Sequence, residues 1–265
     1  MAVRYEMEGR VGIVTFDSPA KLNALSLEDL ETLAEIWAEV ESDRECYAVI
    51  VTGAGSRAFC SGADLGTLIP LITGEVGGSA DARHALGSME FIERAFLKRP
   101  LSKPIVAAVN GYCVAGGFEL LQATDIRLAV PGAFFSLQEP RWGLFPAGGS
   151  TVRLPRQIPF TQAMDILLTG RMLSADEAVS CGLIGRVVEP SSLLSEAKIV
   201  ARQIAENGPL AVQAIKRSVL SCLGRPEAEA FALELEFAAG VFASRDAREG
   251  PAAFMEKRKP VFRNE

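Results

Sequence analysis

The stretch from Lys103 to Glu139 decides the fold, and it opens with KPIVAAVNGYCVAGGFELLQAT. Its first part, Ile105 to Val109, is an unbroken apolar run rich in β-branched residues, which predicts a strand buried on both faces. A turn at Asn110-Gly111 follows, and good helix formers come directly after Gly116 and its neighbouring glycine. We therefore expect a helix to begin near Gly116, shortly after a buried strand.

The predicted helix start offers groups that can bind an anionic oxygen. The first N–H groups of a helix have no partner inside it, and glycine lets an oxygen approach them closely. Glu119 lies one turn into this helix, and a second carboxylate, Glu139, comes in a loop after the predicted strand Ile126 to Val130. The pattern predicts half of an oxyanion-binding site with two carboxylates beside it.

Composition narrows the class of protein. With 265 residues and 49% hydrophobic residues, the chain can build a core for one large domain or two small ones. A net charge of −6 without a long basic run argues against nucleic acid or an anionic membrane surface as the main partner. The five cysteines are scattered without a C-x-x-C pair, so we expect reduced thiols and no metal site.

No targeting segment is visible in the sequence. The N-terminus lacks the charged and apolar regions of a secretory signal, and it is not a basic, acid-poor transit segment. No apolar run reaches the ~18 residues that a membrane span needs. We therefore expect a cytoplasmic protein.

Strands and helices alternate through the first half of the chain. Arg10 to Phe16 alternates like a strand, and Tyr47 to Val51 is another buried one. Between them, Ser26 and Asp29 resemble a capping box that begins a helix running to about Glu41. This order predicts an α/β fold.

The segment Gly53 to Ala58 formally matches the dinucleotide fingerprint G-x-G-x-x-A. That fingerprint requires a helix to begin inside the motif, and this sequence instead continues as a short extended piece through Phe59. We therefore reject a nucleotide site. The following residues, Ser61 to Leu65, are better interpreted as a loop whose N–H groups face a site, and Gly66 to Ala80 as a mobile loop. This loop is a candidate cover for a pocket, and the sequence leaves that role open.

Helices dominate the last third of the chain. Caps and glycine stops predict successive helices at 161–168, 174–181, 192–206, 209 onward, 226–242 and 246–257. The single histidine, His84, would have to serve any Ser-His-Asp triad, and the G-x-S-x-G motif of such hydrolases is absent.

Five motifs together resemble the crotonase (enoyl-CoA hydratase/isomerase) superfamily. They occur in family order over nearly the whole chain, and they are Lys21 to Leu25, Ala58 to Leu65, Lys103 to Asp125, Glu139 with Gly143, and Glu256 to Lys259. The resemblance implies a crotonase-type α/β spiral of repeated ββα units in residues 1–190. It also implies a helical region, 191–265, that contacts CoA and builds a homotrimer or a dimer of trimers.

The resemblance further implies an acyl-CoA thioester substrate whose carbonyl oxygen accepts hydrogen bonds from two backbone N–H groups. By position, these donors fall on Ser61 and Gly116, and the two catalytic glutamates of family hydratases fall on Glu119 and Glu139. The implied reaction is syn addition of water to a trans-2-enoyl-CoA. Two close carboxylates suit it because each raises the pKa of the other, so that the pair can both take and give protons.

Residues for CoA itself also follow from the resemblance. Ala24, Ala63 and Leu65 match positions that line the adenine pocket, with Gly62 and Asp64 in the same loop. Phe254 and Lys257 match a C-terminal helix that reaches CoA, often on a neighbouring subunit. No cofactor is implied beyond the CoA that carries the substrate.

Two alternatives remain open on the sequence. A Δ3,Δ2-enoyl-CoA isomerase would use the same oxyanion-binding groups with one glutamate, moving a proton instead of adding water. A catalytically weak acyl-CoA-binding assembly protein would need neither, and the presence of both Glu119 and Glu139 argues against it. The acyl preference does not follow from the sequence, although Trp142 and Phe145 are candidates for the wall of the acyl pocket.

Overall fold

Strands of the protein form a spiral in which consecutive strands alternate between two sheets. The computed structural model describes residues 2–64, 66, 70 and 90–265. In each of three turns the first strand joins a six-stranded sheet and the second joins a four-stranded sheet. The three pairs are β3 (Ala48–Gly53) with β4 (Ala58–Cys60), β5 (Ile105–Val109) with β6 (Tyr112–Val114), and β7 (Ile126–Ala129) with β8 (Phe134–Ser136).

Both sheets are mainly parallel, as a spiral requires. The larger has the order β1-β2-β3-β5-β7-β10 and the smaller β4-β6-β8-β9. Antiparallel pairs occur where β1 (Val3–Glu8) pairs with β2 (Val11–Phe16) and where β8 pairs with β9 (Leu173–Ser174). At the far edge, β10 (Arg186–Val187) pairs parallel with β7. Every residue of β3 and β5 is buried, as expected for parallel strands covered on both faces.

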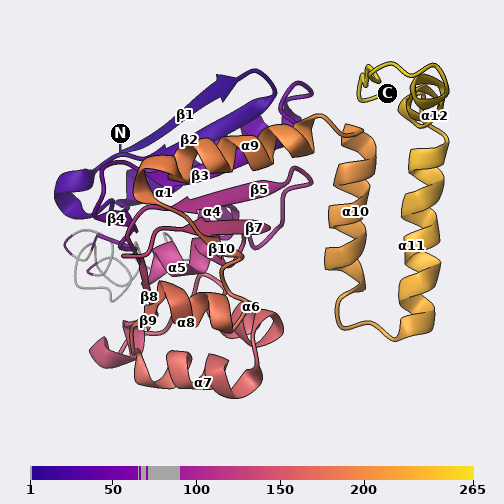
Figure 1. Ribbon diagram of the computed structural model, residues 1–265. Coiled ribbons are helices and arrows are strands. Elements are labelled where there is room, and N and C mark those ends of the chain that lie inside the picture. The colour runs from indigo at the N-terminus through magenta and orange to yellow at the C-terminus, as the bar shows by residue number, and fades with distance from the viewer. Residues whose placement is uncertain (1, 65, 67–69, 71–89) are drawn as a thin grey trace.

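Helices cover the larger sheet and fill the turns of the spiral (Figure 1). Helix α1 (Leu27–Ser42) begins with the predicted capping box between Ser26 and Asp29. It packs against α4 (Glu90–Ala95), while α9 (Leu193–Ala205) packs across β2, β3, β5 and β7. Helix α5 (Gly116–Leu121) directly follows β6. The shorter elements are η1 (Pro19–Lys21), η2 (Glu139–Trp142), α6 (Ser150–Gln157), α7 (Phe160–Thr169), α8 (Ala175–Ser180) and η3 (Pro190–Ser192).

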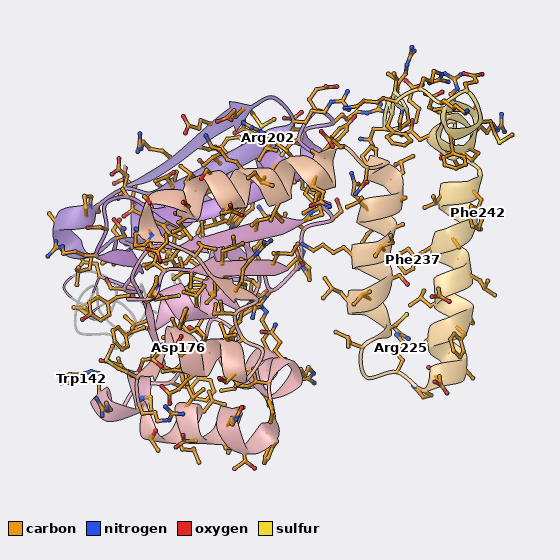
Figure 2. The ribbon with its side chains drawn as sticks, in the orientation of Figure 1. Trp142, Asp176, Arg202, Arg225, Phe237 and Phe242 are labelled. Carbon is orange, nitrogen blue, oxygen red and sulfur yellow. The ribbon has the colours of Figure 1, made fainter. Side chains whose placement is uncertain are left out.

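The last helices form a hairpin that stands beside the core. Helix α10 (Pro209–Cys222) packs against α11 (Glu227–Phe242), and α12 (Asp246–Met255) follows near the C-terminus (Figure 1). Phe237 lies between α10 and α11, where the Arg217 guanidinium sits 5.8 Å from its ring centroid (Figure 2). No residue of α11 is buried. Large apolar side chains are therefore exposed on the hairpin at Ile215, Val219, Leu220, Leu223, Phe231, Leu235 and Phe242.

The predicted α/β spiral is confirmed. The absence of a helix inside the segment Gly53 to Ala58, on which the rejection of the dinucleotide fingerprint depends, is also confirmed, because β3 continues into β4. Helix α6 and strands β1, β6, β8, β9 and β10 were not predicted. The last four strands have two or three residues each, too few to show an alternation. Of the helix expected between Asp81 and Lys98, residues 90–95 are helical, and residues 81–89 lie outside the described part of the chain. All five cysteines are free thiols.

Candidate active site

Two loops that follow neighbouring strands bring backbone N–H groups together. Strands β4 and β6 pair in parallel, with Cys60 beside Cys113, so the chain leaves both strands at the same edge. The loops touch at Gly62, where an added Cβ would lie 2.8 Å from the Gly116 nitrogen. Gly62 also has φ +91, a conformation that other residues rarely adopt. Glycine is therefore required at this point for the two loops to meet.

The predicted donor role of Ser61 does not fit this geometry. The Ser61 N–H already donates a 3.1 Å hydrogen bond to the Leu22 carbonyl oxygen. Two residues on, Ala63 forms a parallel bridge with Leu25, in which Leu25 N–H donates to Gly62 O and Asp64 N–H donates to Leu25 O. The Ala63 N–H therefore points away from Leu25, and no described residue accepts a hydrogen bond from it. Ala63, rather than Ser61, presents a free donor beside Gly116.

Gly116 presents the second backbone donor, as predicted from its place at a helix start. It is the first residue of α5, so its N–H has no acceptor inside the helix, and no described residue outside the helix accepts from it. The preceding residue, Ala115, has φ 49 and ψ −128, which is unusual for a residue with a side chain. Such strained backbone is concentrated at functional sites, where the surrounding structure holds it in place.

Glu119 is buried in the first turn of α5, with its side chain facing the start of another helix. It is 4% exposed, and its Oε1 accepts a 3.2 Å hydrogen bond from the N–H of Ser150, the first residue of α6. The turn before α6 approaches closely: a Cβ added to Gly148 would lie 2.6 Å from Glu119 Oε2. Burial raises the pKa of Glu119, and hydrogen bonds from this turn together with the charge of Arg153 partly offset that rise.

Glu139 provides the second carboxylate, at the start of η2. Burial raises its pKa to about 7, and the charge of Glu119 contributes to the rise, so the two carboxylates lie within electrostatic range of each other. Glu139 Oε2 is buried without a hydrogen-bond partner among the described residues. The structure thus brings Glu119 and Glu139 together, and near neutral pH this pair can hold one proton between them.

Part of the predicted CoA-binding set lies next to this site. Ala24 precedes Leu25, the partner of Ala63 in the bridge, so both alanines are brought together. Asp64 forms an ion pair with Lys21 at 2.9 Å. Leu65 lies outside the described residues, as do His84 and most of the loop expected to cover the pocket.

Two predicted CoA contacts lie elsewhere on the chain. Phe254 and Lys257 are exposed at the end of α12, which Figure 1 places on the side of the molecule opposite to β4. They do not meet Ala63 or Glu119 within one chain. Trp142 and Phe145 are more than two-thirds exposed, and Phe145 lines a hollow together with Pro146 and Arg153. Their place in the wall of the acyl pocket stays a prediction.

Three residues around Glu119 were not predicted from the sequence. Gly148, Ser150 and Arg153 surround the Glu119 carboxylate. The signal was the pair Gly148-Gly149 followed by Ser150 directly before a helix, a pattern that places free N–H groups near an anion. Across the described residues, no group of His, Cys, Asp or Glu side chains is arranged to hold a metal ion. No described helix is long and apolar enough to cross a membrane.

Comparisons with known proteins show the family and the fold. The sequence profile of the enoyl-CoA hydratase/isomerase family matches residues 6–265. The chain is 45% identical to the enoyl-CoA hydratase EchA19 of Mycobacterium tuberculosis, over 98% of this chain and 95% of that protein. It is 36% identical to a short-chain-enoyl-CoA hydratase of Clostridium acetobutylicum, over 96% and 94%. The crystal structure of an enoyl-CoA hydratase from Bacillus anthracis superposes with a TM-score of 0.90 at 32% identity, covering both chains completely.

Proposed function

Because the chain belongs to the enoyl-CoA hydratase/isomerase family of enzymes, we propose that it adds water reversibly to a trans-2-enoyl-CoA to give a 3-hydroxyacyl-CoA. The main observation in support of hydration is the coupled pair Glu119 and Glu139. Both carboxyl groups have raised pKa values, and they lie beside two free backbone donors. Hydration needs a group that takes a proton from water and one that gives a proton to carbon. A coupled pair of carboxyls provides both.

The thioester oxygen is bound by the N–H groups of Ala63 and Gly116. As water adds to the β-carbon, negative charge builds on this oxygen, and two donors aimed at it stabilise the resulting enolate. Loss of one such donor typically slows a reaction by about 100- to 1,000-fold. The contact between Gly62 and Gly116 supports this assignment because it keeps the two donors on adjacent loops.

Glu119 and Glu139 share the proton transfers on one face of the double bond. The pair with one proton deprotonates the attacking water and protonates the α-carbon, so both additions occur on the same side. Burial favours this singly protonated state near neutral pH, since it raises the pKa of Glu139 to about 7. The buried, unpartnered Glu139 Oε2 supports a place for the attacking water, which would satisfy that oxygen.

CoA is bound by the loops around Ala24 and Ala63, and the active protein is a trimer or a dimer of trimers. Phe254 and Lys257 contact the CoA of a neighbouring subunit, because α12 is too far from the site of its own chain. The exposed apolar side chains of α10 and α11 support such an assembly, since contiguous exposed apolar surface marks interaction sites.

The direct test follows the loss of enoyl-thioester absorbance when the purified protein is mixed with crotonyl-CoA. We expect turnover with crotonyl-CoA, accompanied by formation of the 3-hydroxyacyl product. Turnover of a 3-enoyl-CoA without hydration of crotonyl-CoA would assign the protein as an isomerase. Binding of both thioesters without turnover would assign it as a CoA-binding assembly protein. A survey of short, medium, branched and cyclic enoyl-CoAs then defines the acyl preference.

A further inference from the structure

The side chain of Arg153 holds the turn that packs on Glu119. One guanidinium nitrogen, Nη1, donates to the carbonyl oxygens of Phe96 at 3.0 Å and Gly148 at 3.3 Å. The other, Nη2, donates to Leu97 O at 2.5 Å. Arg153 therefore fastens the end of the α4 segment to the turn before α6, the same turn whose N–H groups bind the Glu119 carboxylate.

Within the described part of the chain, no carboxylate contacts the Arg153 guanidinium directly. Its described hydrogen-bond partners are all neutral carbonyl groups, and no ion pair within 4.0 Å joins it to another described residue. Burial lowers its pKa, and the negative charge of Glu119 partly offsets that fall. Arg153 is partly buried, and a cation withdrawn from water is stabilised by a nearby negative charge.

Phe96 links this arrangement to the oxyanion donors. Its ring lies 3.2 Å from where a Cβ on Gly116 would be, and 2.7 Å from where a Cβ on Gly148 would be. The ring therefore fills the space between the Gly116 donor and the turn that binds Glu119. Since Arg153 donates a hydrogen bond to the Phe96 carbonyl oxygen, it also fixes the backbone that carries this ring.

We propose that Arg153 is a positioning residue for hydration: it fixes the Gly148–Ser150 turn against Glu119, and its charge favours the ionised carboxylate in the Glu119–Glu139 pair. This inference rests on the proposed function. The charged groups that face Glu119 are Glu139 from η2 and Arg153 from α6, and the former opposes ionisation while the latter favours it. Arg153 thus balances the repulsion between the two carboxylates.

The first test is the pH profile of kcat/KM for crotonyl-CoA with two variants. Arg153→Met removes the charge, which raises the pKa of the pair, so the fall in rate on the acid side moves to higher pH by ~0.5–1 unit. Arg153→Lys keeps the charge without the forked hydrogen bonds, so we expect a lower kcat with the acid side unmoved. Arg153→Gln, which keeps hydrogen-bond donors without the charge, replaces the Met variant if that variant does not fold.

The second test needs no substrate and therefore separates this inference from the proposed function. Infrared difference spectra during a pH titration follow protonation of Glu119, identified by subtracting the spectra of Glu119→Gln. The carboxyl should protonate at higher pH in Arg153→Met than in the wild type. If the wild type fails to hydrate any enoyl-CoA but this shift is present, the proposed function fails and the electrostatic role of Arg153 stands.

Arg127 supplies a matched control. It is also a partly buried arginine, and it donates to the carbonyl oxygens of Leu183, Gln122 and Thr124. Its charge does not contribute to the pKa shift of Glu119. The Arg127→Met variant should be less stable than the wild type, and the acid side of its pH profile of kcat/KM should be unchanged. The inference is overturned if Arg153→Met also leaves the profile and the infrared titration unmoved, or if Arg153→Lys moves both as far as the Met variant does.

Discussion

The spiral core buries its apolar side chains, whereas the α10–α11 hairpin exposes them. In β3 and β5 every residue is buried, and the carboxylates of the site lie against this core. In α11 no residue is buried, although Phe231, Leu235 and Phe242 are large and apolar. Figure 2 shows the hairpin beside the body that holds the site, and Lys216 of α10 joins the two through an ion pair with Asp125 at 2.7 Å.

The difference separates two tasks within one chain. The core contains the groups proposed for catalysis. Burial there raises the pKa values of the two carboxyl groups, and unusual backbone angles at Gly62 and Ala115 orient the N–H donors. The hairpin leaves its apolar surface uncovered, which costs free energy in water unless another protein surface covers it. Changes in the core should therefore lower kcat without affecting association. Changes in the hairpin should prevent association and raise KM, with a much smaller effect on kcat.

The largest expected effect is in the core, at Glu139. Glu139→Gln cannot take or give the proton, so we expect hydration of crotonyl-CoA to slow by roughly 100- to 10,000-fold. Size measured by light scattering should remain that of the wild type. Unchanged hydration by this variant would contradict the two-carboxylate mechanism.

A somewhat smaller effect should separate two N–H groups of the same loop. Ala63→Pro removes the proposed oxyanion donor and should lower kcat about 100- to 1,000-fold. Ser61→Pro removes an N–H that binds Leu22 O, so it should lower stability by about 1 kcal/mol with a much smaller loss of kcat. Thermal melting checks that both variants are folded, and a larger loss of kcat in Ser61→Pro would restore Ser61 as the donor.

The proposed oxyanion donor moved from Ser61 to Ala63 once the structure was considered, and this change shows which part of the site the sequence could not determine. The glycines, the two glutamates and the helix start at Gly116 were predictable, because residue type alone signals a tight turn or a carboxylate. The direction of one N–H depends on the backbone angles of Gly62, where φ +91 interrupts the alternation of an extended strand. A sequence motif does not specify that backbone angle.

The same contrast holds for the fold. The capping box at Ser26 and the glycine stop at Gly170 depend on neighbouring residues, and both were predicted and are present. Strand β6 exists because it pairs with β4 and β8, which are distant in the sequence. The contacts of Gly148 and Arg153 with Glu119 are likewise long-range, so local patterns identified a turn but not its partner.

In the hairpin, a charge on the exposed apolar face should prevent association. Leu235→Asp places a carboxylate among side chains that we expect a partner to cover, which opposes burial. We expect smaller particles in analytical ultracentrifugation and a KM for crotonyl-CoA raised ~10-fold, because the partner's α12 no longer contacts CoA. The control is Glu234→Asp, a conservative change on the same helix. Wild-type size and KM in Leu235→Asp would contradict the proposed assembly.

The smallest effect is a pH-dependent stability difference in the core. The Glu139 pKa rises from an ordinary 4.5 to about 7 on folding, so the folded state binds the proton more tightly. Its contribution to stability is fully present below pH 4.5 and is lost as the pH rises through 7. The free energy of unfolding of Glu139→Gln should therefore exceed that of the wild type by ~1–3 kcal/mol at pH 8, and by almost nothing at pH 4. A difference independent of pH in urea unfolding would show that Glu139 is not held protonated.

The most direct test of the site is a crystal structure with a non-reactive enoyl-CoA analogue bound. The account predicts the thioester oxygen about 2.7–3.1 Å from the nitrogens of both Ala63 and Gly116, with Glu119 and Glu139 on one face of the double bond. An oxygen bound elsewhere, or carboxylates on opposite faces of the double bond, would contradict it.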